Sequence, residues 1–247
     1  MIPNLVFIPP VIAHRGVGAL APENTLAAIR MAREQGANWV EFDVKITYDG
    51  VPILMHDEQL ERTTDGCGSV CDVLWDQLQK FDAGGRFDSK YEGESIPHLS
   101  EALKVVLEND LSAIIEIKPC PGRAKVTTMV AMIEISKVWP EKDNFPVISS
   151  FDMECLEVAA QLEPPWPRCV LMREWQNDWH DRLKQVDACA ISFRHDYLTQ
   201  ERAKEITDIG INLLAYSVDD PARAKELLAW GVSAVYSCAP RAILGSL

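Results

Sequence analysis

The residues best suited to catalysis or ion binding lie in one stretch, residues 40–57, which reads VEFDVKITYDGVPILMHD. The Asp-Gly pair at 49–50 is a favoured two-residue turn for a β-hairpin, and counting outward from it places Asp43 opposite His56. Glu41 lies two residues before Asp43 and therefore shares its face of the strand. The pattern predicts that two carboxylates and one imidazole meet at a single site.

The opposite face of the same hairpin is apolar, with Val40, Phe42 and Val44 alternating with the acids. A solvated hairpin could carry a lone Glu-x-Asp pair with no function. A packed hairpin base, however, makes buried acids costly unless a cation neutralises them. The flanking residues therefore favour a cation site over a charged surface.

Composition limits the fold and the partners. The chain has 247 residues, 47% of them hydrophobic, which is a length at which an α/β barrel forms one domain, here predicted over residues 1–247. The formal net charge of −13 argues against nucleic acid or an anionic membrane as partner. An anionic substrate would need local positive charge from a metal ion or from placed arginine and lysine residues.

The lack of a signal-peptide pattern and the spacing of the cysteines predict a cytoplasmic location. The first residues lack a basic segment, two prolines interrupt their apolar run, and no apolar stretch is long enough for membrane insertion. The 7 cysteines are irregularly spaced, so they predict free thiols and no disulfide framework.

Short apolar runs alternate with amphipathic segments along the chain. Strands are predicted at residues 11–14, 40–44, 113–117, 147–151, 169–172, 190–193, 213–218 and 234–237, with 51–56 as the returning arm of the hairpin. Helices are predicted at residues 24–35, 100–109, 123–138, 152–161, 179–185, 199–209 and 221–230, with Asn24 and Ser100 at the starts of the first two. This alternation predicts a (β/α)₈ TIM-type barrel. An open doubly wound sheet would need a glycine-rich phosphate loop, and no such motif occurs.

Residues 58–98 interrupt the alternation. They are rich in Gly, Asp and Ser and contain one short helical pattern, near 73–80. Because they directly follow His56 and Asp57, we expect an inserted, lid-like segment near the barrel mouth; a small structural cap is the alternative.

Polar side chains gather where the predicted strands end, which is where barrel enzymes place their chemistry. Glu116 and Lys118 are two apart, so they point the same way and would add a third carboxylate and a cation beside Glu41 and Asp43. Three carboxylates suit a hard divalent cation, Mg²⁺ or Ca²⁺, better than zinc.

Taken together, the motifs resemble the glycerophosphodiester phosphodiesterase family, cytoplasmic bacterial branch. They occur in its order and spacing, as HRG at 14–16, PENT at 22–25, E-x-D at 41–43, DG at 49–50, HD at 56–57 and EIKP at 116–119. The resemblance implies one divalent metal ion on Glu41, Asp43 and Glu116. It also implies an acid–base pair, with His14 as base and His56 as acid. The sequence leaves open both that order and whether water or the substrate's 2-hydroxyl attacks first.

Five further residues are candidates for substrate binding. Arg15 can grip a phosphoryl oxygen in a bidentate manner and Lys118 adds a point charge. Glu23 could orient His14 or Arg15 or reach the metal through water, or could simply favour a helix start. The resemblance implies that Phe151 and Tyr216 could form walls around the glycerol moiety, although core packing is the ordinary role of aromatics at strand ends.

The chain departs from the family pattern near its end. It has Tyr216 in AYSV where many relatives have Trp, and Ser-Cys-Ala-Pro at 237–240 where they have Thr-Asp-x-Pro. The tyrosine keeps an aromatic wall. The loss of the Asp removes any contact that this residue would make to the loop after the first strand.

The sequence thus predicts metal-dependent hydrolysis of small-molecule glycerophosphodiesters to glycerol 3-phosphate and an alcohol. The oligomeric state, with a homodimer as one option, is left open. One rival is a Schiff-base aldolase that uses Lys118, but carboxylates beside this lysine favour its charged form. The other rival is a non-catalytic barrel that binds phosphoesters, although no metal ligand or proton carrier is missing here.

Overall fold

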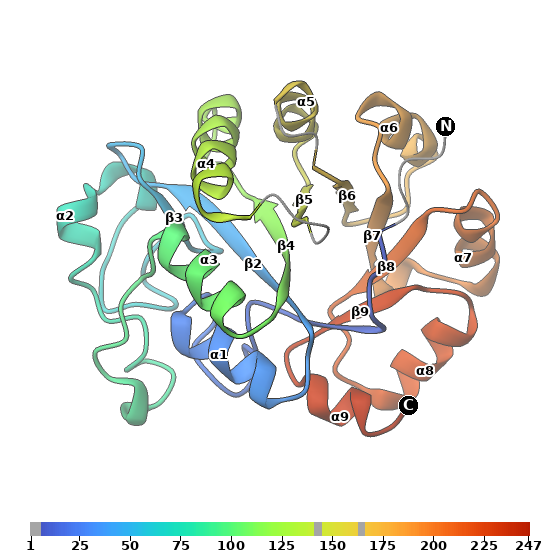
Figure 1. Ribbon diagram of the computed structural model, residues 1–247, viewed down its shortest axis with the longest axis horizontal. Helices are drawn as coiled ribbons and strands as arrows, with labels where there is room; N and C mark the ends of the chain where they lie inside the picture. Colours follow the sequence, from blue (N-terminus) through green and yellow to red (C-terminus); the bar gives the residue numbers. More distant parts are fainter. Residues whose placement is uncertain (1–5, 141–144, 163–165) are drawn as a thin grey trace.

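Parallel strands close into a barrel at the centre of the molecule (Figure 1). The computed structural model describes residues 6–140, 145–162 and 166–247. Its parallel strands are β1 (Val11–Ala13), β2 (Trp39–Ile46), β4 (Ser112–Ile117), β5 (Val147–Ser150), β6 (Arg168–Met172), β7 (Ala190–Arg194), β8 (Asn212–Tyr216) and β9 (Ala234–Ser237). Because β1 pairs with both β2 and β9, the sheet has no open edge on this side. The predicted (β/α)₈ barrel is confirmed.

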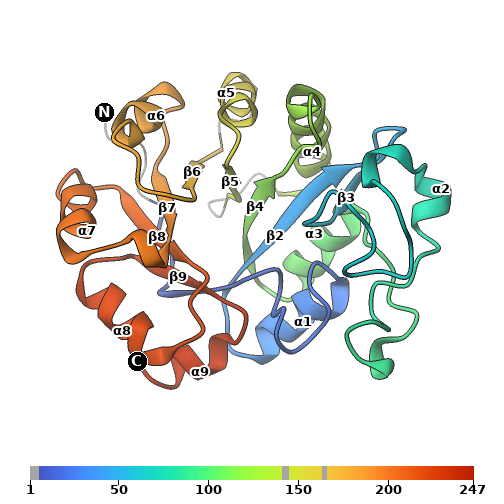
Figure 2. The same ribbon diagram turned by 180° about the vertical axis from the view of Figure 1, so that it is seen from behind.

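Helices surround the strands on the outside (Figures 1 and 2). They are α1 (Leu26–Glu34), α3 (Leu99–Glu108), α4 (Ala124–Val138), α5 (Met153–Gln161), α6 (Trp179–Gln185), α7 (Gln200–Thr207), α8 (Pro221–Ala229) and α9 (Pro240–Leu244). The first seven follow the predicted helices, whereas α9 was not predicted, because five residues are too few to show a helical period. None of the helices in the described residues is long and apolar enough to cross a membrane.

Alternate residues of each strand face opposite sides of the barrel wall. Val40 and Phe42 pack outward with the helices in one large apolar cluster. Ile12, Ile114 and Tyr236 belong to a separate cluster inside the barrel. The inner apolar side chains fill the barrel below its mouth, so the polar residues at the strand ends rest on a packed floor.

The hairpin register differs by one residue from the prediction. β3 (Pro52–Leu54) pairs antiparallel to β2 with Val44 opposite Leu54, and the amide of Met55 donates to the carbonyl of Asp43 at 3.1 Å. Asp43 therefore lies opposite Met55, and the prediction that it lies opposite His56 is wrong.

The cause of this shift is a longer turn. The Thr47 amide bonds the Val51 carbonyl, so residues 48–50 connect the strands, with Gly50 in the left-handed region at φ 83°. The side chain of Thr47 stabilises this loop by donating to Asp49 and accepting from the Val51 amide. A three-residue loop with a left-handed glycine is the next commonest hairpin connection after the two-residue turn.

Two helix starts also differ from the prediction. Thr25, not Asn24, caps α1 by accepting a hydrogen bond from the Ala28 amide at 3.2 Å. At α3 the cap is His98, with Glu101 bonding back to its amide, so Ser100 lies inside the helix. Asn24 is thereby free for a role in the site.

Residues 58–98 fold beside the barrel, next to β3, with the short helix α2 (Trp75–Leu78) and the short 3-10 turns Val70–Asp72 and Ser89–Tyr91 (Figure 1). They enclose a small apolar cluster that includes Leu60, Val70 and Leu78. Tyr91 donates to the carbonyl of Leu20, which ties the segment to the loop after β1. The lid-like role and the single-domain boundaries stay predictions.

Candidate active site

Three buried carboxylates meet at the mouth of the barrel. Glu41 and Asp43 come from β2, and Glu116 lies directly across from Asp43 on β4. One oxygen of each lies within 4.8 Å of the others. Adjacent parallel strands and the two-residue period of β2 bring them together without any loop, so their placement depends only on strand pairing.

Burial and mutual repulsion make it costly to ionise all three carboxylates. Burial, followed by repulsion from Asp43, raises the pKa of Glu116 to about 7. Burial, followed by repulsion from Asp43 and Glu116, raises the pKa of Glu41 well above its ordinary range. The pKa of Asp43 is lowered: burial opposes its ionisation, but Lys118 and Arg15 outweigh it. Buried oxygens of this kind form a donor set that a hard divalent cation fits.

Arg15 is held in place by an unusual backbone. Its φ is 51° and that of Gly16 is 79°, and a Cβ on Gly16 would come within 2.5 Å of the Ala28 Cβ. The HRG motif needs its glycine for this reason. The turn directs the Arg15 amide to a Glu41 carboxylate oxygen at 3.0 Å and its Nε to within 3.6 Å of Asp43.

Lys118 supplies the second cation. Its Nζ lies 3.3 Å from Glu116 and 3.5 Å from Asp43, and 5.9 Å from the centre of the Phe151 ring. An isolated lysine in a dry pocket, as a Schiff-base mechanism requires, is therefore not what the structure contains.

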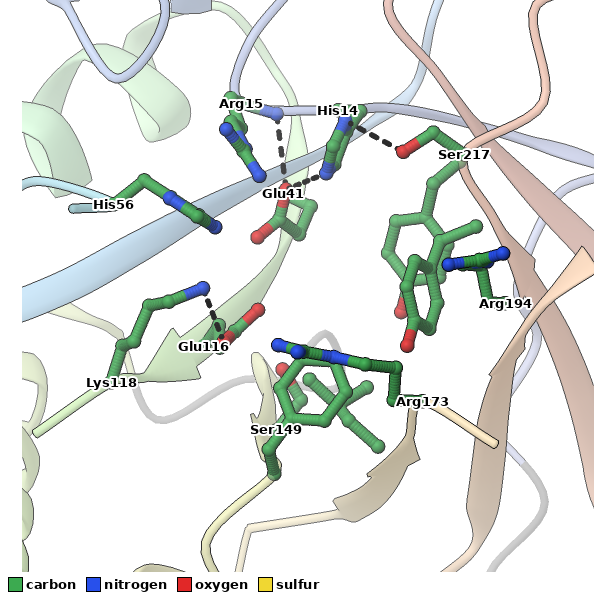
Figure 3. Close-up of a pocket in the computed structure, with 14 residues that line it drawn as sticks. His14, Arg15, Glu41, His56, Glu116, Lys118, Ser149, Arg173, Arg194 and Ser217 are labelled. Atoms are coloured by element: carbon green, nitrogen blue, oxygen red, sulfur yellow. Dashed lines mark hydrogen bonds and ion pairs between the residues drawn. The ribbon is translucent and has the colours of Figure 1, made fainter. Parts of the chain in front are cut away.

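His14 lies on the other side of the carboxylates (Figure 3). Its Nε2 is 3.8 Å from Glu41, and its Nδ1 is 3.3 Å from both the Cys238 sulfur and the Ser217 hydroxyl. Burial, helped by the charge of Arg15, lowers the pKa of His14 to about 4. The imidazole is thus neutral at physiological pH, and Cys238 stands beside it where many relatives were expected to have Asp.

His56 points into the same space from the end of the hairpin (Figure 3). Its Nδ1 contacts Asp57 at 2.6 Å. Asp57 is paired in turn with Arg62, which also binds both oxygens of Glu23 at 2.7 and 2.8 Å. Glu23 accepts from Arg15 at 2.9 Å, so its predicted contact with Arg15 is present, and the network joins the support of His56 to that of Arg15.

Asn24 is a site residue that the sequence reasoning placed elsewhere. Its φ is 57°, its amide donates to Asp43 Oδ2 at 2.8 Å, and its side-chain oxygen accepts from the Asp43 backbone at 3.0 Å. The left-handed conformation, which Asn tolerates better than most residues, turns the side chain away from the helix start and onto the acid. A positive φ leaves no pattern in a single sequence, so the motif letters alone could not reveal this contact.

The carboxylates and histidines open onto a cavity of about 330 Å³. Eight of the predicted site residues line it: His14, Arg15, Glu41, His56, Glu116, Lys118, Phe151 and Tyr216. The other two, Asp43 and Glu23, lie behind it and hold Arg15. Phe151 and Tyr216 meet edge to face, with ring centres 5.7 Å apart, and so form a wall as well as a packing contact.

Arg173 and Arg194 also line this cavity, and the sequence reasoning missed both. They end or follow β6 and β7, at the same edge of the barrel as the recognised motifs. Applying the strand-end rule to every predicted strand would have found them.

A parallel barrel with buried carboxylates, two imidazoles and several cations at its mouth defines the class of barrel enzymes that act on anionic substrates. The glycerophosphoryl diester phosphodiesterase family matches residues 14–240. The chain therefore belongs to this family and is an enzyme.

Individual relatives agree with that assignment. A glycerophosphodiester phosphodiesterase of Caldanaerobacter subterraneus is 30% identical over 243 residues, which cover 95% of this chain and 96% of the relative. Mouse glycerophosphodiester phosphodiesterase 1 is 38% identical over 166 residues, but these cover 66% of this chain and 49% of the mouse protein. A phosphodiesterase of Oleispira antarctica, solved in complex with the product sn-glycerol-3-phosphate, is 34% identical, with a TM-score of 0.94 and 97% of each chain covered.

Proposed function

We propose that this enzyme hydrolyses glycerophosphodiesters to glycerol 3-phosphate and an alcohol, with one divalent cation, Mg²⁺ or Ca²⁺, and with His14 and His56 as its acid–base pair. The observation that carries the proposal is the meeting of three buried carboxylates with two imidazoles at one cavity. The family membership and the product complex of the Oleispira antarctica relative support the choice of substrate.

Glu41, Asp43 and Glu116 would hold the cation. Burial, followed by repulsion between the carboxylates, raises the pKa values of Glu41 and Glu116 although Arg15 and Lys118 lie nearby, so a bound cation would favour the ionised forms. A bound divalent cation supplies charge for a phosphoryl oxygen and lowers the pKa of a water or hydroxyl nucleophile.

The chain's own residues perform the remaining work. Arg15 and Lys118 bind the phosphoryl oxygens, because their charged groups lie at the carboxylate cluster and line the cavity. The neutral imidazole of His14 accepts a proton from the nucleophile. Burial lowers the pKa of His56, and the hydrogen bond of its Nδ1 to Asp57 opposes this shift in part. The imidazole would donate its proton to the departing alkoxide.

In the net reaction the bond between phosphorus and the leaving oxygen breaks and a water oxygen becomes bonded to phosphorus. The two water hydrogens end on the alcohol and on the medium. Direct attack by water and prior attack by the 2-hydroxyl differ in one observable, since only the second forms a cyclic phosphate, which ³¹P NMR of the reaction detects.

The test is a screen of diesters, including glycerophosphocholine, with enzymatic detection of glycerol 3-phosphate. EDTA should abolish turnover, and Mg²⁺ or Ca²⁺ should restore it. We expect His14→Ala and His56→Ala each to lose about 10²–10⁴-fold in kcat while divalent metal still binds.

His180→Ala is the matched control, since His180 is an exposed residue of α6. Near wild-type rates in both site variants would overturn the acid–base assignment. Failure to hydrolyse any diester with either metal would overturn the proposed activity. The cytoplasmic location stays a prediction from the sequence.

A further inference from the structure

The cavity has a cationic end that the proposed chemistry does not use. Met172 pairs with Phe193 across β6 and β7, so the next residues, Arg173 and Arg194, leave the barrel at neighbouring positions. Both line the cavity and enter it from the side opposite His56 and Lys118 (Figure 3).

These two arginines differ in how far their charge is already neutralised. Arg194 is paired with Asp196 at 2.7 Å and lies 5.2 Å from the centre of the Tyr197 ring. Arg173 has no hydrogen bond or ion pair within the described ranges 6–140, 145–162 and 166–247. Among the residues that line the cavity, the only acids are Glu41 and Glu116 of the carboxylate cluster. Both side chains are exposed at the cavity mouth, and in a chain of net charge −13 the unpaired guanidinium of Arg173 is available to an anion that enters the cavity.

Phe151 and Tyr216 line the same cavity: the Phe151 ring lies 5.9 Å from Lys118 Nζ at the carboxylate end and meets the Tyr216 ring edge to face. The Tyr216 hydroxyl donates to the Met172 carbonyl at 3.0 Å, which fixes the ring next to Arg173. The aromatic rings carry no charge, so the middle of a ligand that spans the cavity must be apolar or hydroxylated. Its two ends must be anionic, because each end would face positive charge.

The direction of the substrate follows from the proposed function, on which this inference rests. If His56 protonates the leaving alcohol, that alcohol lies on the His56 side. The glycerol that keeps the phosphate then extends the other way, along Phe151 and Tyr216 toward the two arginines. Arg173 and Arg194 would then contact a group carried on the far primary carbon of this glycerol.

We propose that Arg173 and Arg194 form a second anion subsite, which selects diesters whose retained glycerol carries another phosphate on its far primary carbon. Hydrolysis is unchanged in its bonds: phosphorus exchanges the leaving alcohol for water, and the second phosphate takes no part. The product is a glycerol phosphorylated at both primary carbons.

A pair of substrates with the same leaving group tests this subsite. One is glycerophosphocholine, and the other is the same molecule with a phosphate on the far primary carbon of glycerol; released choline is measured for both. A third substrate carries a methyl phosphodiester at that carbon. It shows whether the subsite binds a free phosphomonoester or a phosphodiester, as in a longer glycerol phosphate chain. We expect the phosphorylated substrates to have a kcat/KM at least about tenfold higher than glycerophosphocholine, as for a hydrogen bond between charged groups.

The variants identify the residues. Arg173→Gln should lower the ratio of kcat/KM for the phosphorylated over the unphosphorylated substrate about tenfold, and Arg194→Gln should lower it less, because Asp196 already holds that guanidinium. Arg30→Gln removes the same charge from the exposed face of α1 and should leave the ratio unchanged.

Two outcomes would overturn the subsite: a wild-type ratio of one or below, or an Arg173→Gln variant that slows all the substrates equally. The second outcome would mean that Arg173 binds the phosphate common to them. If no substrate is hydrolysed at all, it is the proposed activity that fails, which the glycerophosphocholine measurement shows separately.

Discussion

The two halves of the barrel mouth are built differently. At the ends of β1, β2 and β4 the charged side chains are buried or half-buried, and several have two or more polar partners, as Asp43 has in Asn24, Arg15 and Lys118. At the ends of β6 and β7 the cavity is lined by Arg173, which has no hydrogen bond or ion pair in the described part of the chain, and by Arg194, which has Asp196.

The contrast indicates that the two halves of the site have different tasks. Arg15 and Asn24 are held at positive φ, a strained conformation that persists only where surrounding contacts impose it. Such a region can hold reacting groups in a fixed geometry but tolerates little change. The β6 and β7 ends carry few constraints, so their side chains can change with the substrate at little cost to the fold.

The largest effect should come from removing one carboxylate of the constrained half. Asp43→Asn keeps the shape of the side chain but removes the charge that Arg15 and Lys118 face. We expect kcat/KM to fall by about 10³-fold or more, together with loss of the thermal stabilisation that we expect Mg²⁺ or Ca²⁺ to give the wild-type protein.

Glu108→Gln is the control for this variant, because it removes an equal charge at the exposed end of α3. If Asp43→Asn kept wild-type activity and metal stabilisation, the constrained half would not be the reacting half.

A smaller effect should follow from loosening the support of the same carboxylate. Asn24→Gly allows the positive φ but deletes both hydrogen bonds to Asp43. We expect the Mg²⁺ concentration for half-maximal activity to rise about 10–100-fold, as for other residues that orient metal ligands, with kcat largely restored at saturating metal. An unchanged metal requirement would show that Asp43 is positioned by β2 alone.

The smallest effect should occur on the aromatic wall between the halves. Tyr216→Phe keeps the ring against Phe151 and loses only the hydroxyl bond to the Met172 carbonyl. We expect KM to rise about two- to tenfold with kcat retained, in keeping with one neutral hydrogen bond. A loss of more than about 100-fold in kcat would instead assign the hydroxyl to the chemical step.

Strand pairing explains why much of the site could be predicted. Glu41, Asp43 and Glu116 lie on strands whose periodicity is visible in the sequence, and the end of a parallel strand always lies at the same edge of a barrel. His56 was placed in the site on a wrong register. It reaches the cavity because it follows the end of β3, with Asp57 bonded to its ring, and not because it lies opposite Asp43.

Turns and long-range contacts explain what could not be predicted. The choice between a two- and a three-residue hairpin loop depends on Thr47 and Asp49 side-chain bonds that the Asp-Gly pair does not reveal. The bonds of Arg62 to Glu23 and Asp57 join residues up to 39 apart in the chain. No local pattern encodes such a contact.

The amino-acid sequence alone predicts the barrel, the edge at which polar residues gather and the identity of the acids, imidazoles and cations there, because strand period and chain order are local properties. Which atoms meet is visible only in the folded structure: Asn24 contacts Asp43, Cys238 lies beside His14, and Arg173 lines the cavity with no hydrogen bond or ion pair in the described residues. These contacts depend on backbone angles and on side chains brought together from distant strands, and both are fixed only when the whole barrel has closed.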